Sequence, residues 1–132
     1  MKIVVSPNPY RDKQFKNARQ ACSILREAGA EVALCLPFDV DKTFEIPHDL
    51  RFQDIQKEIK TADMLICFGG DGTILHSSKI ATEHNLPILG VNIGTMGFIA
   101  ELESGEIELL RRIPKGEYTV EERTMLDVSV GN

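Results

Sequence analysis

The feature that constrains this chain most is a junction between an apolar strand and a helix. Residues 64–68 read Met-Leu-Ile-Cys-Phe and pass without a spacer into Gly69-Gly70-Asp71-Gly72-Thr73. Apolar residues then recur at helical spacing over residues 73–84. A fully apolar strand followed at once by a glycine turn and a helix is typical of a parallel sheet that helices cover on both faces.

The rest of the chain repeats this alternation. Strand-like apolar runs occupy residues 2–6, 31–36 and 88–92, and helical spacing occurs over residues 15–28, 50–60 and 106–113. Gly29 follows the first helical segment and is expected to end it. We therefore predict an α/β fold, a Rossmann-like parallel sheet with flanking helices and right-handed crossovers.

The last residues follow a different pattern. Residues 118–120 and 126–130 alternate apolar with polar side chains, as half-exposed antiparallel strands do. We expect an α/β nucleotide-binding domain over residues 1–117, and the first strands of a β-rich, mostly absent second domain over residues 118–132. Because isolated strands leave their edges uncovered, the chain is expected to be a truncated piece of a longer one.

The composition of the chain limits which partners, cysteine roles and cellular location are expected. The chain has 132 residues and a formal net charge of −5, and it contains no cluster of Lys and Arg, so we expect no nucleic-acid partner. Cys22, Cys35 and Cys67 are odd in number and show no Cys-x-x-Cys spacing, which favours buried thiols over a disulfide framework or a zinc site. No apolar stretch has the length of a signal peptide or a membrane span, so we expect a cytoplasmic protein without a membrane partner.

The glycine loop is a candidate phosphate site. Gly69, Gly70 and Gly72 let backbone N–H groups approach a ligand closely, and the helix that follows points its positive end at the same place. Thr73 is a candidate N-cap and a hydroxyl donor. Only Asp71 in this loop can accept a proton or hold a metal ion. The plainer alternative is a turn in which the glycines serve backbone geometry alone and the aspartate makes a local hydrogen bond.

A second glycine-rich loop follows the strand at residues 88–92. Asn92, Gly94 and Phe98 offer an amide, a flexible backbone position and an aromatic ring, which suits an adenine or nicotinamide ring. Phe98 could equally be a core residue. Both loops follow strands, and ligands of open α/β sheets bind at the carboxyl ends of the strands, so the two loops could line one cleft.

Together these segments resemble the NAD kinases. Residues 69–75 resemble the family's Gly-Gly-Asp-Gly-Thr signature, residues 90–98 its Asn-x-Gly-x-x-Gly-Phe signature, and residues 121–126 the Glu-Arg-x-x-Leu stretch at the entry to its second domain. The first motif alone is shared with diacylglycerol and sphingosine kinases and, in a close variant, with phosphofructokinases. The resemblance covers roughly residues 60–130.

The resemblance implies a magnesium-dependent transfer of the ATP γ-phosphoryl group to the 2′-hydroxyl of the adenosine ribose of NAD, giving NADP. Carried over by motif, Asp71 is the expected proton acceptor. The expected nucleotide-binding residues are Gly69, Gly70, Asp71, Gly72, Thr73, His76, Asn92, Gly94 and Phe98; no protein metal ligand is expected. Two interpretations of His76 stay open. The family places polar residues at this position that reach the dinucleotide, whereas an isolated histidine on a helix is more often a solvated or core-edge side chain.

The resemblance also implies what is missing. The family's second domain supplies an Asn-Glu or Asn-Asp pair that grips the ribose, together with much of the oligomer interface, and neither can be placed before Asn132. The chain alone is therefore expected to be inactive, and the full-length protein a homo-oligomer. Two alternatives stay open: a lipid kinase of the diacylglycerol type, and a non-catalytic nucleotide-binding module.

Overall fold

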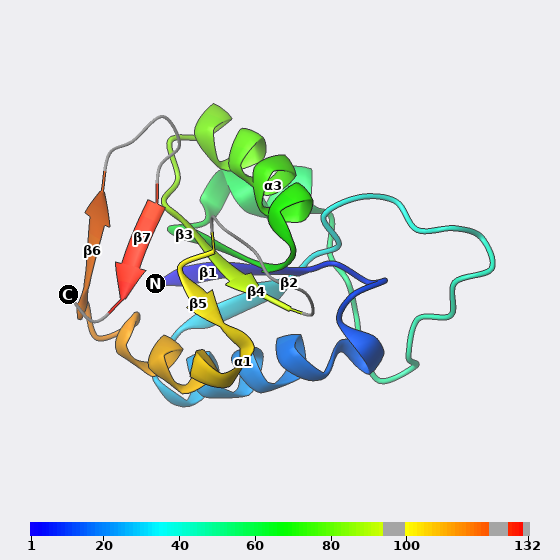
Figure 1. Ribbon diagram of the computed structural model, residues 1–132, viewed down its shortest axis with the longest axis horizontal. Coiled ribbons are helices and arrows are strands. Elements are labelled where there is room, and N and C mark those ends of the chain that lie inside the picture. The colour runs from blue at the N-terminus through cyan, green and yellow to red at the C-terminus, as the bar shows by residue number, and fades with distance from the viewer. Residues whose placement is uncertain (94–99, 122–126, 131–132) are drawn as a thin grey trace.

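The computed structural model describes residues 1–93, 100–121 and 127–130 (Figure 1). In chain order its elements are β1 (Lys2–Pro7), η1 (Lys13–Phe15), α1 (Lys16–Glu27), β2 (Glu31–Leu34), α2 (Ile55–Glu58), η2 (Ile59–Thr61), β3 (Met64–Gly69), α3 (Asp71–Glu83), β4 (Ile88–Asn92), β5 (Leu102–Glu103), η3 (Ser104–Arg112), β6 (Tyr118–Glu121) and β7 (Asp127–Val130). The elements marked η are 3₁₀-helices.

The sheet has the strand order β2-β1-β3-β4-β7-β6, and β5 also pairs with β4. Strands β2, β1, β3, β4 and β5 are mutually parallel, which confirms the predicted Rossmann-like α/β fold. The expected antiparallel pair is β6 with β7, and β7 joins the sheet beside β4 through the pairing of Ile88 with Asp127. The division at residue 118 stays a prediction. Because β1, β3 and β4 run in the same direction, their carboxyl ends lie at one edge of the sheet.

Helices cover both faces of the sheet. In Figure 1, α1 and η3 lie below the strands, and α3 lies above them. Alternate residues of each strand supply the two cores: Ile3, Val5, Met64 and Ile66 belong to the core with α1 and η3, whereas Val4, Leu65 and Cys67 belong to the core with α2 and α3. Strands buried on both faces must be apolar throughout, which is why they appear in the sequence as unbroken apolar runs.

Two of the predicted helices differ from expectation. Residues 50–54 of the segment predicted as helix are not helical, because Gln53 donates its N–H to the carbonyl of Leu34 at 2.8 Å and forms a bridge with Cys35. Helix α2 begins only after Asp54, whose carboxylate accepts the N–H of Gln56 at 3.0 Å. The segment 106–113 is the 3₁₀-helix η3 and begins earlier, at the capping box of Glu103 and Glu106.

Gly29 ends α1 as predicted. Its φ is +99°, in the left-handed region that favours glycine. The N–H of Gly29 donates to Arg26, and the N–H of Ala30 donates to Leu25, which together form a Schellman motif.

The cysteines are buried and free, as the sequence predicted. Burial raises the pKa of Cys35 and of Cys67 to about 12, so both thiols stay protonated near neutral pH. Among the helices of the described residues, none has the length and apolar character needed to cross a membrane.

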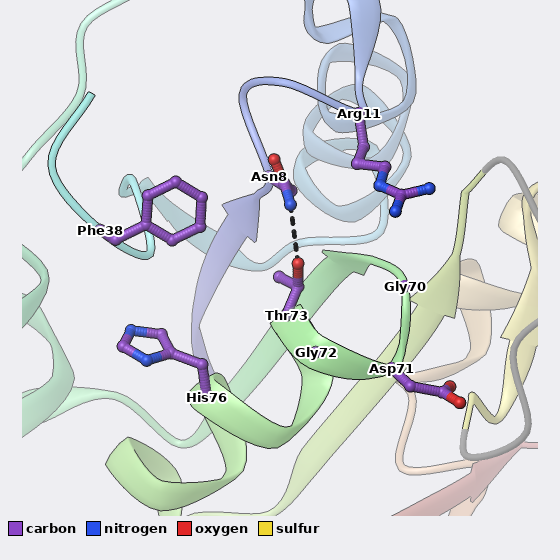
Figure 2. A pocket seen from close by; sticks show the side chains of 8 residues that line it. All are labelled: Asn8, Arg11, Phe38, Gly70, Asp71, Gly72, Thr73 and His76. Atoms are coloured by element: carbon purple, nitrogen blue, oxygen red, sulfur yellow. Dashed lines mark hydrogen bonds between the residues drawn. The ribbon is translucent and has the colours of Figure 1, made fainter. Parts of the chain in front are cut away.

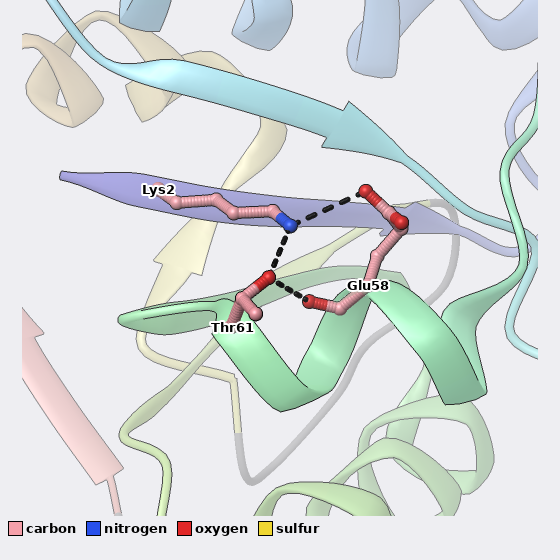
Figure 3. A network of polar contacts seen from close by, with 3 residues as sticks. All are labelled: Lys2, Glu58 and Thr61. Atoms are coloured by element: carbon pink, nitrogen blue, oxygen red, sulfur yellow. Dashed lines mark hydrogen bonds and ion pairs between the residues drawn. The ribbon is translucent and has the colours of Figure 1, made fainter.

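A polar cluster ties the start of the chain to the α2–η2 segment (Figure 3). The Nζ of Lys2 lies 3.2 Å from Oε1 of Glu58 and also donates to the hydroxyl of Thr61. The two charged side chains are only 16% and 18% exposed. Asp63 adds a backbone clamp, because its carboxylate accepts the N–H of Lys2 and its own N–H donates to the Lys2 carbonyl, both at 2.7 Å.

Lys2→Met should lower the free energy of unfolding by about 1–3 kcal/mol, because it leaves the carboxylate of Glu58 largely buried without its cation. The double variant Lys2→Met, Glu58→Met should recover most of that loss, since it removes the uncompensated charge. Urea unfolding followed by circular dichroism measures both. Equal destabilisation by the double variant would show that the loss does not come from the unpaired charge of Glu58.

Candidate functional site

The glycine loop turns the chain from β3 into α3. Gly70 is the N-cap, with φ −97° and ψ −171°, and as a glycine it has no side chain with which to cap the helix. The N–H of Ile74 donates to the carbonyl of Gly70 at 3.1 Å, so the first-turn N–H groups that precede it have no acceptor inside the helix. The prediction that Thr73 is the N-cap was wrong. The helix begins two residues earlier, at Asp71, where a carboxylate is favoured by the positive end of the helix dipole.

The glycines of the loop fall into two kinds. A Cβ on Gly69 would lie 2.6 Å from Oγ1 of Thr73, so this glycine is required for the close packing of α3 on β3. A Cβ on Gly70 or Gly72 would meet nothing within 4 Å, and neither residue has a positive φ. Backbone geometry and packing therefore explain why residue 69 is glycine, but they do not explain Gly70 and Gly72. Because these two residues lack side chains, a ligand can approach the backbone at the start of the helix.

This bare helix start opens onto a pocket of about 520 Å³. The pocket is lined by residues of the β1–α1 loop, the loop after β2 and the start of α3, namely Asn8, Arg11, Phe38, Gly70, Asp71, Gly72, Thr73 and His76. Figure 2 shows Phe38 and His76 on one side of the Asn8–Thr73 pair, and Arg11 and Asp71 on the other. The pocket thus has an aromatic side and a charged side.

Asn8 connects β1 to the start of α3. Its N–H donates to the carbonyl of Phe68 at 2.7 Å, and its Oδ1 accepts the N–H of Tyr10 at 2.9 Å. Its Nδ2 donates to Oγ1 of Thr73 at 2.8 Å, which places the threonine hydroxyl at the centre of the pocket (Figure 2). The predicted hydroxyl of Thr73 is therefore in the site, although its structural role is different from capping.

Our reasoning from the sequence missed Asn8, Arg11 and Phe38. A signal existed for Asn8, because it follows strand β1 and the carboxyl ends of neighbouring parallel strands share an edge. Arg11 lies three residues further on, in the same loop. No signal in the sequence indicates Phe38, which comes from the loop after β2 and reaches the pocket only through tertiary packing.

His76 is exposed but is not an isolated, solvated side chain. Its Nε2 lies 2.8 Å from the carbonyl oxygen of Pro37, so this nitrogen carries the proton and donates. Its ring also meets the ring of Phe38 edge to face, with centroids 6.2 Å apart. The structure places His76 in the pocket wall and joins it to the loop after β2.

Asn92 lies at the same edge of the sheet but does not line the pocket. It pairs in register with Gly69, its side chain is 5% exposed, and its Nδ2 donates to Oε2 of Glu103 at 2.9 Å. Within the described part of the chain its Oδ1 has no hydrogen-bond partner. Gly94 and Phe98, the other predicted residues of this loop, lie outside the described residues.

Asp71 is the only carboxylate among the residues that line this pocket. Within residues 1–93, 100–121 and 127–130, no group of three or more His, Cys, Asp and Glu side chains is arranged to hold a metal ion. A magnesium ion held mainly by substrate phosphates needs only one or two protein carboxylates, and Asp71 meets that requirement.

Comparison with known proteins gives a consistent picture. The model of the ATP-NAD kinase N-terminal domain family matches residues 2–118. The NAD kinase of Corynebacterium diphtheriae is 32% identical over 98% of this chain and 42% of its own length. The NAD kinase of Bacteroides fragilis is 32% identical over 97% of this chain and 45% of its own length. The NAD kinase of Methanopyrus kandleri is 37% identical over 86% of this chain and 39% of its own length.

The chain therefore spans less than half the length of these curated relatives. The match to a solved structure of a flavone reductase covers 84% of this chain and 50% of that chain, with a TM-score of 0.40 and 15% identity.

The three loop glycines should respond differently to alanine. Gly69→Ala should lower the free energy of unfolding by about 1–3 kcal/mol, because the new methyl group overlaps Thr73. Gly70→Ala and Gly72→Ala should change it by less than about 1 kcal/mol, since the space around them is open and Gly72 lies inside a helix. Thermal and urea unfolding test this, and a Gly70→Ala variant as unstable as Gly69→Ala would contradict it.

Proposed function

The chain belongs to the ATP-NAD kinase N-terminal domain family, and on that premise we propose that the full-length protein transfers the γ-phosphoryl group of ATP to the 2′-hydroxyl of the adenosine ribose of NAD, giving NADP. The partners of this chain are then small-molecule nucleotides. The observation that carries the proposal is the position of Asp71, a carboxylate in the first turn of a helix whose glycine start is bare and faces a pocket.

The pocket suits a phosphate-bearing ligand for three reasons. The first-turn N–H groups of α3 point along the helix axis toward it, and the helix dipole makes this end electropositive. Arg11 adds a guanidinium, which suits phosphate oxygens, to the lining. The hydroxyl of Thr73 and the amide of Asn8 lie between these groups and the aromatic side of the pocket.

Asp71 supplies the carboxylate that the proposed proton transfer from the acceptor hydroxyl needs. Phosphoryl transfer depends mostly on positioning and charge stabilisation, so a carboxylate need only orient the attacking hydroxyl and take its proton late. The hydroxyl oxygen forms a bond to the γ-phosphorus as the bond to the leaving ADP oxygen breaks, and the hydroxyl proton passes to Asp71. Magnesium bound with ATP would supply neutralisation of the phosphate charge, and Asp71 is the carboxylate of the pocket lining that would hold it.

The ribose hydroxyl is proposed to arrive from the side of β4. Asn92 ends that strand next to Gly69, and its buried Oδ1 is an acceptor for a ligand hydroxyl or amine. The carboxylate of Glu103 only accepts hydrogen bonds, so it holds the Nδ2 of Asn92 and turns the oxygen away from itself. Gly94 and Phe98 stay proposed ligands of the dinucleotide.

We further propose that the full-length protein is cytoplasmic and homo-oligomeric. The residues from 118 on begin a β-rich second domain, and the 132-residue chain alone is inactive. The lipid kinase alternative is less well supported than NAD kinase, because the matching family model and the relatives named above are NAD kinases.

In the full-length protein, Asp71→Asn should lower kcat for NADP formation by about 10²–10⁴-fold, since the amide cannot accept the hydroxyl proton. The unfolding midpoint should stay near that of the wild type. Steady-state assays with NAD, ATP and magnesium, read through an NADP-specific dehydrogenase, measure this. Glu83→Gln is a matched control, because Glu83 is an exposed carboxylate on the same helix outside this pocket. An Asp71→Asn enzyme within about twofold of wild type would overturn the proposed role.

A further inference from the structure

One wall of the pocket comes from a distant part of the sequence. Phe38 lies in the loop after β2, yet it lines the same pocket as Gly70, Asp71 and Thr73 (Figure 2). Its ring is half-buried, and it is the one purely hydrocarbon aromatic ring of the pocket lining. An apolar ring beside a phosphate-attracting helix start is not needed to bind phosphate, so it calls for a separate explanation.

The ring of Phe38 is held from several sides. It stacks on Tyr10, with centroids 6.1 Å apart and ring planes 8° from parallel, and His76 meets it edge to face. The backbone on each side is also fastened. Nε2 of His76 donates to the carbonyl of Pro37 at 2.8 Å, and the N–H of Asp41 donates to the hydroxyl of Tyr10 at 2.8 Å. The ring is therefore positioned before any ligand arrives, which reduces the entropic cost of binding against it.

The two sides of the pocket match the two parts of a nucleotide. The charged side, with Arg11 and the start of α3, suits phosphates, and the aromatic side, with Phe38, suits a purine base. Its volume of about 520 Å³ is within the range of small-molecule sites, about 300–1,000 Å³. A single nucleoside triphosphate can therefore contact both sides.

The strand order separates this ligand from the dinucleotide. Asn8 follows β1, Asp71 follows β3 and Asn92 ends β4, and the sheet runs β1-β3-β4. Asp71 therefore lies between the β1 side and the β4 side, and Figure 2 shows Phe38 on the opposite side of the Asn8–Thr73 pair from Asp71. With the acceptor hydroxyl on the β4 side, the side of Phe38 is left for the phosphoryl donor.

We propose that Phe38 stacks on the base of the phosphoryl donor, a purine nucleoside triphosphate, and that His76 is a positioning residue that holds Phe38 in place. The inference rests on the proposed function for the identity of the donor. His76 keeps the loop after β2 against α3 through its hydrogen bond to Pro37, and it sets the ring of Phe38 by edge-to-face contact.

The test compares a ligand that has a base with one that lacks it. In the full-length protein, Phe38→Ala should raise the Kd for ATP, measured by calorimetry with magnesium present, by about tenfold or more. The Kd for inorganic tripolyphosphate should stay within about twofold, because it carries phosphates without a base. Phe44→Ala is the matched control, because Phe44 lies in the same loop and packs on Tyr10 and Phe15 but does not line this pocket.

Three outcomes would overturn the role of Phe38: an unchanged Kd for ATP, an equal loss for tripolyphosphate, or a raised Kd for NAD with that for ATP unchanged. Calorimetry needs no turnover, so the result is independent of the Asp71→Asn assay. An inactive wild-type protein whose ATP binding still depends on Phe38 would overturn the proposed function and keep the stacking assignment.

The role of His76 needs a readout that depends on Phe38. His76→Ala should raise the Kd for ATP. His76→Gln should raise it less, since the glutamine amide can donate to the Pro37 carbonyl and so keep part of the affinity. In a Phe38→Ala background, His76→Ala should raise the Kd for ATP by less than about a further twofold, as expected for residues that act as a unit. The same factor in both backgrounds would show that His76 contacts the ligand itself, and would overturn the positioning role.

Discussion

The site depends on the close approach of α3 to the sheet beneath it. Gly69 lets Thr73 lie against the end of β3, and Gly90 does the same for Ile74 over β4, where a Cβ would come within 2.8 Å of Cδ1 of Ile74. Two glycines on neighbouring strands thus leave the space into which the first turn of α3 packs. Without that contact the N-terminus of α3 would lie farther from the edge at which β1 and β4 end.

The remaining parts of the site are fastened to this turn. Asn8 joins the β1 loop to Thr73, and His76, one turn further along α3, joins the loop after β2 through Pro37. Two segments that are distant from α3 in the sequence therefore converge on the first two turns of this helix. Each link is a hydrogen bond at 2.8 Å from a side chain that the core does not require, which fits a role in shaping a site more than in holding the fold together.

The same arrangement fits the proposed role of a single carboxylate, Asp71, as the proton acceptor in this pocket. Asp71 is the first residue of the helix and cannot move far from the N–H groups of Gly72 and Thr73, which have no acceptor inside the helix. A second acid would oppose phosphate binding at the electropositive helix end. A single acid among lining residues that include Arg11 is compatible with the proposed phosphate binding and supplies the proposed proton acceptor.

The sequence by itself determined the layer architecture, because strands buried on both faces must be apolar. It indicated the loop that holds Asp71, where Gly69 leaves the space that Thr73 needs as α3 packs on β3. It also indicated the ending of α1 at Gly29, which depends on local backbone geometry alone. Tertiary structure decided the rest. The pairing of Gln53 with Cys35 replaced the start of a predicted helix, and Phe38 entered the pocket through contacts with Tyr10 and His76. Local patterns record backbone preference and burial, whereas contacts between distant segments depend on how the finished layers bring their loops together.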